Sequence, residues 1–246
     1  MPARSLTNSG FQQLQKLDTC TVSNAIERIE ARPRNEGSIS GAAVRCQFPN
    51  FEPMLGYAAT GRMRSTAAPV SGGAYYENMH WWRYLASIPE PRVMVVQDVD
   101  DRPGLGALVG GLHAVIGRAL NCVGYVANGS VRDLSEVEAI GFHLFSGTVA
   151  VSHMYAHVGD YGEPVEIGGL KISPGGLIHG DRHGVHTIPL SVAADIPEMA
   201  SQILREELDL SEFCRSPRFS LEGLEEKLQR LPGDGIEVPL GARRLR

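Results

Sequence analysis

Two apolar runs in the middle of the chain are separated by a segment with helical spacing. The run over 92–98 (RVMVVQD) and the run over 122–127 (CVGYVA) predict buried strands. Between them, apolar residues at 112, 115, 116, 119 and 120 recur at intervals of three and four, which predicts a helix. Strand, helix and strand in this order form a βαβ unit with parallel strands. The carboxyl ends of parallel strands meet at one edge of the sheet, where α/β proteins bind their ligands.

The flanking sequence predicts further elements of both kinds. Closely spaced turn residues over 163–189 indicate short strands in an antiparallel or mixed layer. We expect an α/β protein with one domain over 1–210 and a helical C-terminal extension over 211–246. The other predicted helices cover 11–17, 19–31, 75–86, 134–140, 191–208 and 221–231, and the other predicted strands lie within 42–46, 56–64 and 142–152.

Composition and charge exclude several classes of protein. The 246 residues carry 23 Lys plus Arg against 28 Asp plus Glu, a net charge of −5, so there is no basic footprint for nucleic acid. No run approaches the roughly 18 apolar residues of a membrane span, and the polar start MPARSLTNSG is not typical of a signal peptide. The four cysteines are scattered rather than paired, which predicts reduced thiols and a cytoplasmic location.

Glycines gather where the predicted helix of the βαβ unit begins. Backbone amides at the start of a helix lack intrahelical partners and attract anions, so Gly110, Gly111, Leu112 and His113 are candidates to bind a carboxylate. The pattern matches neither a P-loop nor a GxGxxG fingerprint. A tight turn that simply requires glycine explains it equally well.

Arg132 and Asp133 follow the second strand of the same unit. A guanidinium can hold a carboxylate through two parallel hydrogen bonds, and an Asp can bind a hard divalent cation through oxygen. Together with the glycine turn, the pair could hold an α-keto acid. An isolated Arg-Asp dipeptide is more often a surface ion pair.

Two other groups of residues have both a functional and a structural interpretation. His153 and His157 have the spacing of a helical ligand pair, but the preceding residues indicate a strand, so we interpret them as loop histidines near a pocket rim. The aromatic segment 75–86 contains both tryptophans. We interpret it as core or subunit contact, although aromatic residues at the rim of a site would favour a larger substrate.

The motifs Gly110-Gly111-Leu112-His113 and Val123 to Glu136 (VGYVANGSVRDLSE) resemble the RraA-like proteins. This family includes class II 4-hydroxy-4-methyl-2-oxoglutarate/4-carboxy-4-hydroxy-2-oxoadipate aldolases and regulators of RNase E. The resemblance covers about residues 11–210, and its most specific part is the spacing of twenty residues between Gly111 and Arg132.

The resemblance implies a layered β-sheet and helix sandwich of the swivelling-domain type, assembled into homotrimers or homohexamers with sites between subunits. It implies a lyase that uses Mg²⁺ or Mn²⁺ to cleave a 4-hydroxy-2-oxo acid or to decarboxylate oxaloacetate through a metal-stabilised pyruvate enolate. By position, Gly110 to His113 would bind the substrate carboxylate, Arg132 the keto acid, and Asp133 the metal. The only lysines are Lys16, Lys171 and Lys227, none in this site, which argues against a Schiff-base aldolase.

One departure from the aldolase pattern concerns Gly111. The aldolases of the family usually carry an acid at this position, twenty-one residues before the Arg. Glycine combined with Arg-Asp-x-x-Glu136 is a pattern of other members. His113 could take over proton transfer at a near-neutral pKa, although a histidine with a purely structural role in a helix is the commoner case. Alternatively, an acid of a neighbouring subunit could complete the site, and the candidates are Glu206, Glu207 and Asp209.

Three functions remain open on this basis. The first is the metal-dependent lyase on a small oxo acid. The second is a non-catalytic member that binds and regulates a partner protein such as a ribonuclease. The third is a lyase or hydratase that acts on a sugar-acid derivative.

Overall fold

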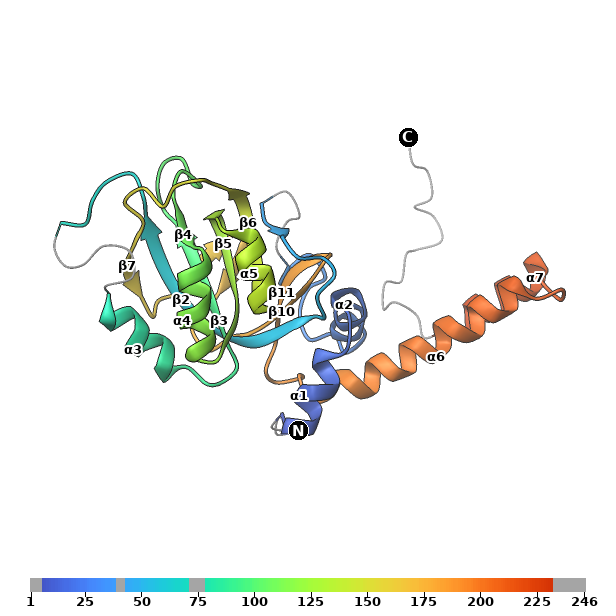
Figure 1. Ribbon diagram of the computed structural model, residues 1–246. Coiled ribbons are helices and arrows are strands. Elements are labelled where there is room, and N and C mark those ends of the chain that lie inside the picture. Colours follow the sequence, from blue (N-terminus) through green and yellow to red (C-terminus); the bar gives the residue numbers. More distant parts are fainter. Residues whose placement is uncertain (1–5, 39–42, 71–77, 232–246) are drawn as a thin grey trace.

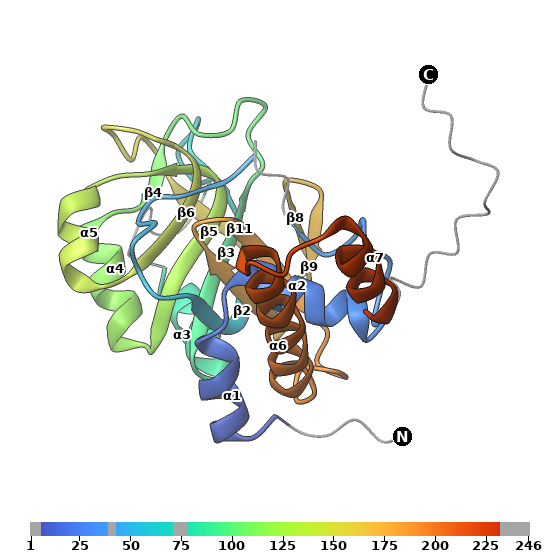
Figure 2. The ribbon, with the colours of Figure 1, turned by 90° about the vertical axis from the view of Figure 1, so that its right-hand side faces the viewer.

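The computed structural model describes residues 6–38, 43–70 and 78–231. Its centre is one large, strongly curved sheet of nine strands, with helices on both sides (Figures 1 and 2). The sheet strands are β1 (Arg45–Cys46), β2 (Met54–Arg64), β3 (Arg92–Asp98), β4 (Ala107–Val109), β5 (Cys122–Val131), β6 (His143–Val149), β7 (His157–Tyr161), β10 (Leu177–Asp181) and β11 (Gly184–Ile188). A separate hairpin consists of β8 (Val165–Ile167) and β9 (Leu170–Ile172).

The helices of the described chain are α1 (Asn8–Gln15), α2 (Thr19–Arg28), α3 (Met79–Ser87), α4 (Gly111–Ala119), α5 (Leu134–Ile140), α6 (Ile196–Arg215) and α7 (Leu221–Arg230). Helices α4 and α5 lie side by side on one face of the sheet (Figure 1). Helices α1, α2 and the first part of α6 pack together beside β10 and β11 (Figure 2). None of these helices combines the length and the apolar character that a membrane crossing requires.

The predicted βαβ unit is confirmed. Strands β3 and β5 are parallel, with Val95 opposite Val126, and α4 connects them. The main path of the sheet runs β1-β6-β5-β3-β2-β10-β11. The strand pairs β2–β3, β3–β5 and β5–β6 are parallel, whereas β10 pairs with β2 and β11 in antiparallel fashion, so the sheet is mixed. The antiparallel pairing predicted for part of 163–189 is likewise present.

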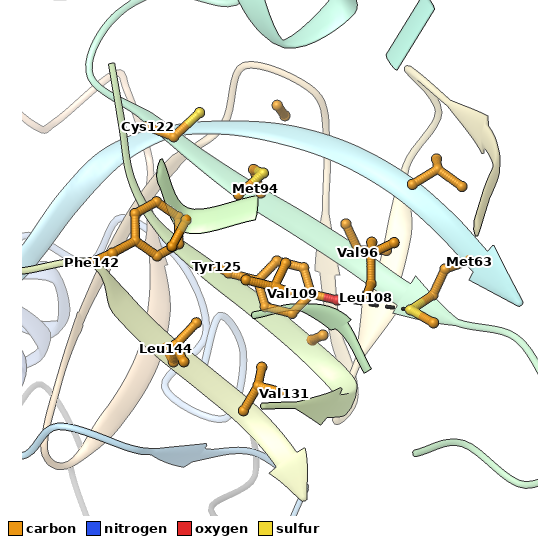
Figure 3. Close-up of a cluster of buried hydrophobic side chains, with 14 of the residues drawn as sticks. Met63, Met94, Val96, Leu108, Val109, Cys122, Tyr125, Val131, Phe142 and Leu144 are labelled. Atoms are coloured by element: carbon orange, nitrogen blue, oxygen red, sulfur yellow. Dashed lines mark hydrogen bonds between the residues drawn. The ribbon is translucent and has the colours of Figure 1, made fainter. Parts of the chain in front are cut away.

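The core beneath α3, α4 and α5 consists of apolar side chains from the sheet and the helices that cover it (Figure 3). Tyr125 and Phe142 are among its largest fully buried members. Trp81 and Trp82 of α3 are also buried here, which confirms the interpretation of the aromatic segment as core. Residues 75–77 of that segment lie outside the described residues.

The helix predicted over 191–208 needs correction at both ends. The helix expected over 191–208 begins at Ile196, because residues 190–195 form turns and Pro197 occupies the first helical turn, where its missing N–H costs nothing. It also continues to Arg215 and crosses residue 210, and the division of the chain there stays a prediction. The last part of α6 and the whole of α7 project away from the body of the molecule (Figure 1).

Candidate functional site

The glycine turn and the Arg-Asp pair meet at the carboxyl edge of the sheet. Strand β4 runs parallel to the end of β5, with Val109 opposite Val131. The backbone N–H of Arg132 donates to the carbonyl of Val109 at 3.0 Å. Gly110 and Arg132 therefore follow two paired strand ends, and the two motifs that lie far apart in sequence become neighbours.

Asp133 links the two motifs through its carboxylate. Oδ2 accepts a hydrogen bond from the backbone N–H of Gly111 at 3.1 Å, and Oδ1 accepts one from Nε of Arg132 at 3.2 Å. The backbone of Asp133 is left-handed, with φ +54° and ψ +41°. A residue with a side chain reaches this region at a cost of about 1–3 kcal/mol, and such residues concentrate at functional sites. The turn directs the carboxylate to α4, and no side-chain hydrogen bond caps its own helix α5.

Both glycines leave room for this close approach. A Cβ atom on Gly110 would overlap Oδ2 of Asp133 and would lie 2.9 Å from Cγ of Arg132. A Cβ atom on Gly111 would overlap the carboxylate of Glu136. The space that an acidic side chain at position 111 would enter therefore already holds an acid, which comes from α5.

Glu136 is the site residue that the sequence reasoning did not select. It lies three residues after Asp133, so both side chains project from the start of the same helix toward α4. The Arg-Asp-x-x-Glu spacing was visible, but its contact with Gly111 depends on how α5 packs against α4. Packing of this kind cannot be read from the spacing alone.

The site is open to solvent and carries both signs of charge. About 30% of the Arg132 side chain and 34% of the Asp133 side chain are exposed. Among the described residues, the Arg132 side chain has its one hydrogen bond to Asp133 through Nε, which leaves both terminal amino groups for a ligand. An exposed guanidinium beside two carboxylates can bind an anion and a cation together.

His113 lies elsewhere than its predicted role requires. Its side chain is 1% exposed and packs against Trp82, with ring centroids 5.5 Å apart. Burial lowers the pKa of His113 to about 4, so the expected near-neutral pKa is wrong. The imidazole faces the core because position 113 shares the buried side of α4 with Ala114 and Gly117. Leu112 faces outward and is 51% exposed, so only its backbone can serve a site at the start of α4.

The other candidates are not brought to Arg132 within one chain. His153 lies in a loop and His157 begins β7. Nδ1 of each donates to a neighbouring backbone carbonyl, that of Met154 for His153 and that of Tyr155 for His157. On α6, Glu206 pairs with Arg28 at 3.2 Å and Asp209 with Lys227 at 2.5 Å. A contribution of these acids from a neighbouring copy stays a prediction.

Comparisons with known proteins agree with this fold. A family model described as "RraA-like: Aldolase/RraA" matches residues 19–186. A protein of Halalkalibacterium halodurans, provisionally named as a 4-hydroxy-4-methyl-2-oxoglutarate aldolase, is 30% identical over 97 residues. The match covers 39% of this chain and 46% of that protein, so the chain spans less than half the length of this relative.

Solved structures show the same architecture. An uncharacterized protein from Pseudomonas syringae pv. tomato superposes with a TM-score of 0.70 at 21% identity, over 92% of this chain and 97% of that one. RraAS2 of Streptomyces coelicolor, described as an unusual member of the RNase ES inhibitor RraA protein family, superposes with a TM-score of 0.65 at 19% identity, over 84% and 98%. At these identities the likeness concerns the fold.

Proposed function

The chain belongs to the RraA-like family, and from that premise we propose that it is a divalent-metal-dependent C–C lyase that acts on a small 2-oxo acid. The observation that carries the proposal is the meeting of Arg132, Asp133 and Glu136 at the Gly110–Gly111 turn. One cation and two carboxylates there match the charges of a keto acid and of the metal that would accompany it. The substrates that fit are a 4-hydroxy-2-oxo acid and oxaloacetate.

Asp133 and Glu136 fit Mg²⁺ or Mn²⁺. Such ions are held in proteins by one or two carboxylates and keep several waters, and both side chains lie at a solvent-exposed edge. No group of three or more His, Cys, Asp or Glu suited to a metal occurs in the described ranges, so a cage built only of protein ligands is not the arrangement we propose. The ion, when bound, would supply Lewis-acid stabilisation of negative charge on the keto oxygen.

The chain's own residues account for the remaining steps. The terminal amino groups of Arg132 would bind the substrate carboxylate or keto oxygen, assisted by the Leu112 amide at the start of α4. When the C–C bond breaks, its electron pair moves into the enolate of pyruvate, and the positive charge of Arg132 stabilises that oxyanion. In the aldol cleavage, Glu136 would accept the proton of the 4-hydroxyl group, and the enolate carbon would then take up a proton to give pyruvate.

A Schiff-base route finds no support in the site. Lys16 follows α1, Lys171 lies on β9 and Lys227 lies on α7. None of these elements contributes to the Gly110–Asp133 junction. In the described part of the aromatic segment, Trp81 and Trp82 are turned into the core and therefore do not rim the site.

We further propose a homotrimer or homohexamer. Apolar side chains are exposed near the same edge of the sheet, and Val151 is 98% exposed. Burial of exposed apolar side chains against a second copy would remove them from water. The exposed apolar side chains of the segments that meet or flank this edge are Leu105, Leu112, Val115, Val149, Val151, Met154 and Tyr155.

The test is turnover of oxaloacetate and of a panel of 4-hydroxy-2-oxo acids with Mg²⁺ or Mn²⁺, followed as pyruvate release. Arg132→Ala and Asp133→Asn should each lower kcat/KM roughly 100-fold or more, since each removes a charge that acts in the transition state. Arg83→Ala, an exposed arginine on α3, is the matched control and should leave turnover unchanged. If the folded wild-type protein turns over none of these substrates with metal present, the lyase proposal fails.

A partner-binding role is the second candidate, and the projecting α6–α7 segment favours it. Leu208 on α6 and Leu221 on α7 are 57% and 72% exposed. If turnover is absent, the decisive measurement is binding of a ribonuclease of the RNase E type by the wild-type protein and by a Leu208→Glu variant. Loss of binding in the variant would support regulation through a partner.

A further inference from the structure

Two buried acids lie between β3 and the glycine turn and do not belong to the site just described. Asp98 ends β3 and is 2% exposed, and Asp100 follows in the next loop at 5%. Buried carboxylates are expensive unless hydrogen bonds compensate them. The hydrogen-bond donors of each acid show which segments of the chain that acid holds together.

Asp98 holds the loop that precedes β4. Its Oδ1 accepts from the N–H of Asp100 at 3.1 Å, and its Oδ2 accepts from the N–H of Gly104 at 2.8 Å. The carbonyl of Gly104 in turn accepts a hydrogen bond from the Ser130 hydroxyl on β5. The side chain of Asn128 bonds both backbone groups of Asp98, at 2.8 and 2.9 Å. The loop is thus tied to β3 and β5 together.

Asp100 holds the end of β2 against the same loop. Its Oδ2 accepts from the N–H and the hydroxyl of Ser65 at 2.7 and 3.0 Å and from the N–H of Thr66 at 3.1 Å, and its Oδ1 accepts from the Thr66 hydroxyl at 2.8 Å. The Ser65 oxygen, fixed in this way, accepts from the N–H of Gly106 at 3.2 Å. Gly106 immediately precedes β4.

Strand β4 is only three residues long and leads directly into the Gly110–Gly111 turn. A displacement of Gly106 would be transmitted along Ala107–Val109 to Gly110 and Gly111, because so short a strand has few hydrogen bonds of its own to resist it. The Gly111 amide must lie within hydrogen-bond distance of Asp133 for the site to form.

We propose that Asp98 and Asp100 are positioning residues that set the register of β4 and thereby the distance between the Gly111 amide and the Asp133 carboxylate. The expected effect on turnover rests on the proposed lyase function. The expected effect on hydrogen–deuterium exchange of the turn does not depend on that function. Neither acid touches the substrate, so the inference concerns how the site is held rather than the chemistry itself.

The experiment compares Asp100→Asn with wild type and with Asp160→Asn, an exposed carboxylate paired with Arg62 that serves as the control. An amide at position 100 keeps the shape but cannot accept all four hydrogen bonds. Hydrogen–deuterium exchange of the peptide that covers 104–112 should become at least 10-fold faster, while peptides from α6 and β10 change less than 2-fold. With oxaloacetate, kcat should fall about 10-fold, and KM should change less.

Ser65→Ala is the second variant. It removes the link to Gly106 together with the bond from the Ser65 hydroxyl to Asp100, and it keeps both acids and the three other hydrogen bonds of Asp100. It should accelerate exchange in the same peptide. If exchange over 104–112 stays at the wild-type rate in both variants, or rises only in proportion to exchange everywhere, the positioning role is wrong. If wild type shows no turnover but exchange responds locally, the lyase proposal fails and the positioning role stands.

Discussion

The buried histidines make this fold sensitive to acid between about pH 6.5 and 5. The side chains of His113, His179 and His186 are at most 4% exposed. Burial lowers the pKa of His113 and His179 to about 4 and that of His186 to about 3, where the contact with His179 adds to the effect. In the unfolded chain each imidazole titrates near 6.5.

The sign follows from which state binds more protons. Below about pH 6.5 the unfolded chain takes up protons that the folded protein excludes, so each histidine contributes stability that is complete above that pH and is lost as the pH falls. At pH 5 the loss is about 2 kcal/mol for each histidine, from 1.5 pH units at about 1.4 kcal/mol each. These three histidines together lose about 6 kcal/mol, which is comparable to the whole stability of a typical domain, about 5–15 kcal/mol. Burial also lowers the pKa of the half-buried His143 to about 4, so this fourth histidine adds to the loss.

The two carboxylates with a lowered pKa affect stability at lower pH than the histidines. Hydrogen bonds that outweigh burial lower the pKa of Asp100 and Asp181, so their contribution is lost only below about pH 4. Burial raises the pKa of Asp98, so its effect on stability has the opposite sign, with one such carboxyl group against four histidines whose pKa is lowered. The interval from pH 7.5 to 5 therefore reports mainly on the imidazoles.

Urea unfolding at pH 7.5, 6.0 and 5.0, followed by the fluorescence of the two buried tryptophans, measures the effect. His186→Gln retains a nitrogen that can bond to Nδ1 of His179, at 3.2 Å in the native pair, and removes one titrating group. The variant should lose about 2 kcal/mol less than wild type between pH 7.5 and 5, whereas His80→Gln, an exposed position on α3, should behave as wild type. A free energy of unfolding that changes by less than about 2 kcal/mol in wild type over this interval would refute the reasoning.

Three further outcomes are expected. The melting temperature of Gly111→Ala should lie within a few degrees of wild type, because the new methyl group meets only the flexible end of Glu136. The displaced Glu136 should lower the affinity for Mn²⁺, measured by electron paramagnetic resonance, at least 10-fold. An unchanged affinity would show that Glu136 does not belong to the metal site. Val151→Asp should shift the mass measured by light scattering toward the monomer, and an unaltered mass would place the subunit interface elsewhere. Tyr125→Phe should change the free energy of unfolding by less than about 1 kcal/mol, because the one hydrogen bond of its buried hydroxyl within the described chain is the weak one to the Met63 sulfur, at 3.8 Å. A loss above about 2 kcal/mol would show a stronger bond.

The sequence by itself determined the elements whose signals are local. Two apolar runs with a helically spaced segment between them predicted β3, α4 and β5 and their parallel pairing. A buried strand gives a continuous apolar run, and a helix with one buried face gives apolar residues three and four positions apart. The glycine turn and Arg132–Asp133 could be selected for the same reason, since both follow strand ends that must share one edge.

Only the tertiary structure decided which side chains face that edge. His113 lies two residues after Gly111 and Glu136 lies three residues after Asp133. The rotation of α4 nevertheless buries His113, whereas the packing of α5 brings Glu136 against Gly111. Asp98 and Asp100 have the sequence signature of ligands at a strand end, but their carboxylates turn inward to backbone donors. The period of apolar residues shows which residues of one helix or strand share its buried face. Whether two side chains from different elements meet depends on contacts that form only when the chain folds.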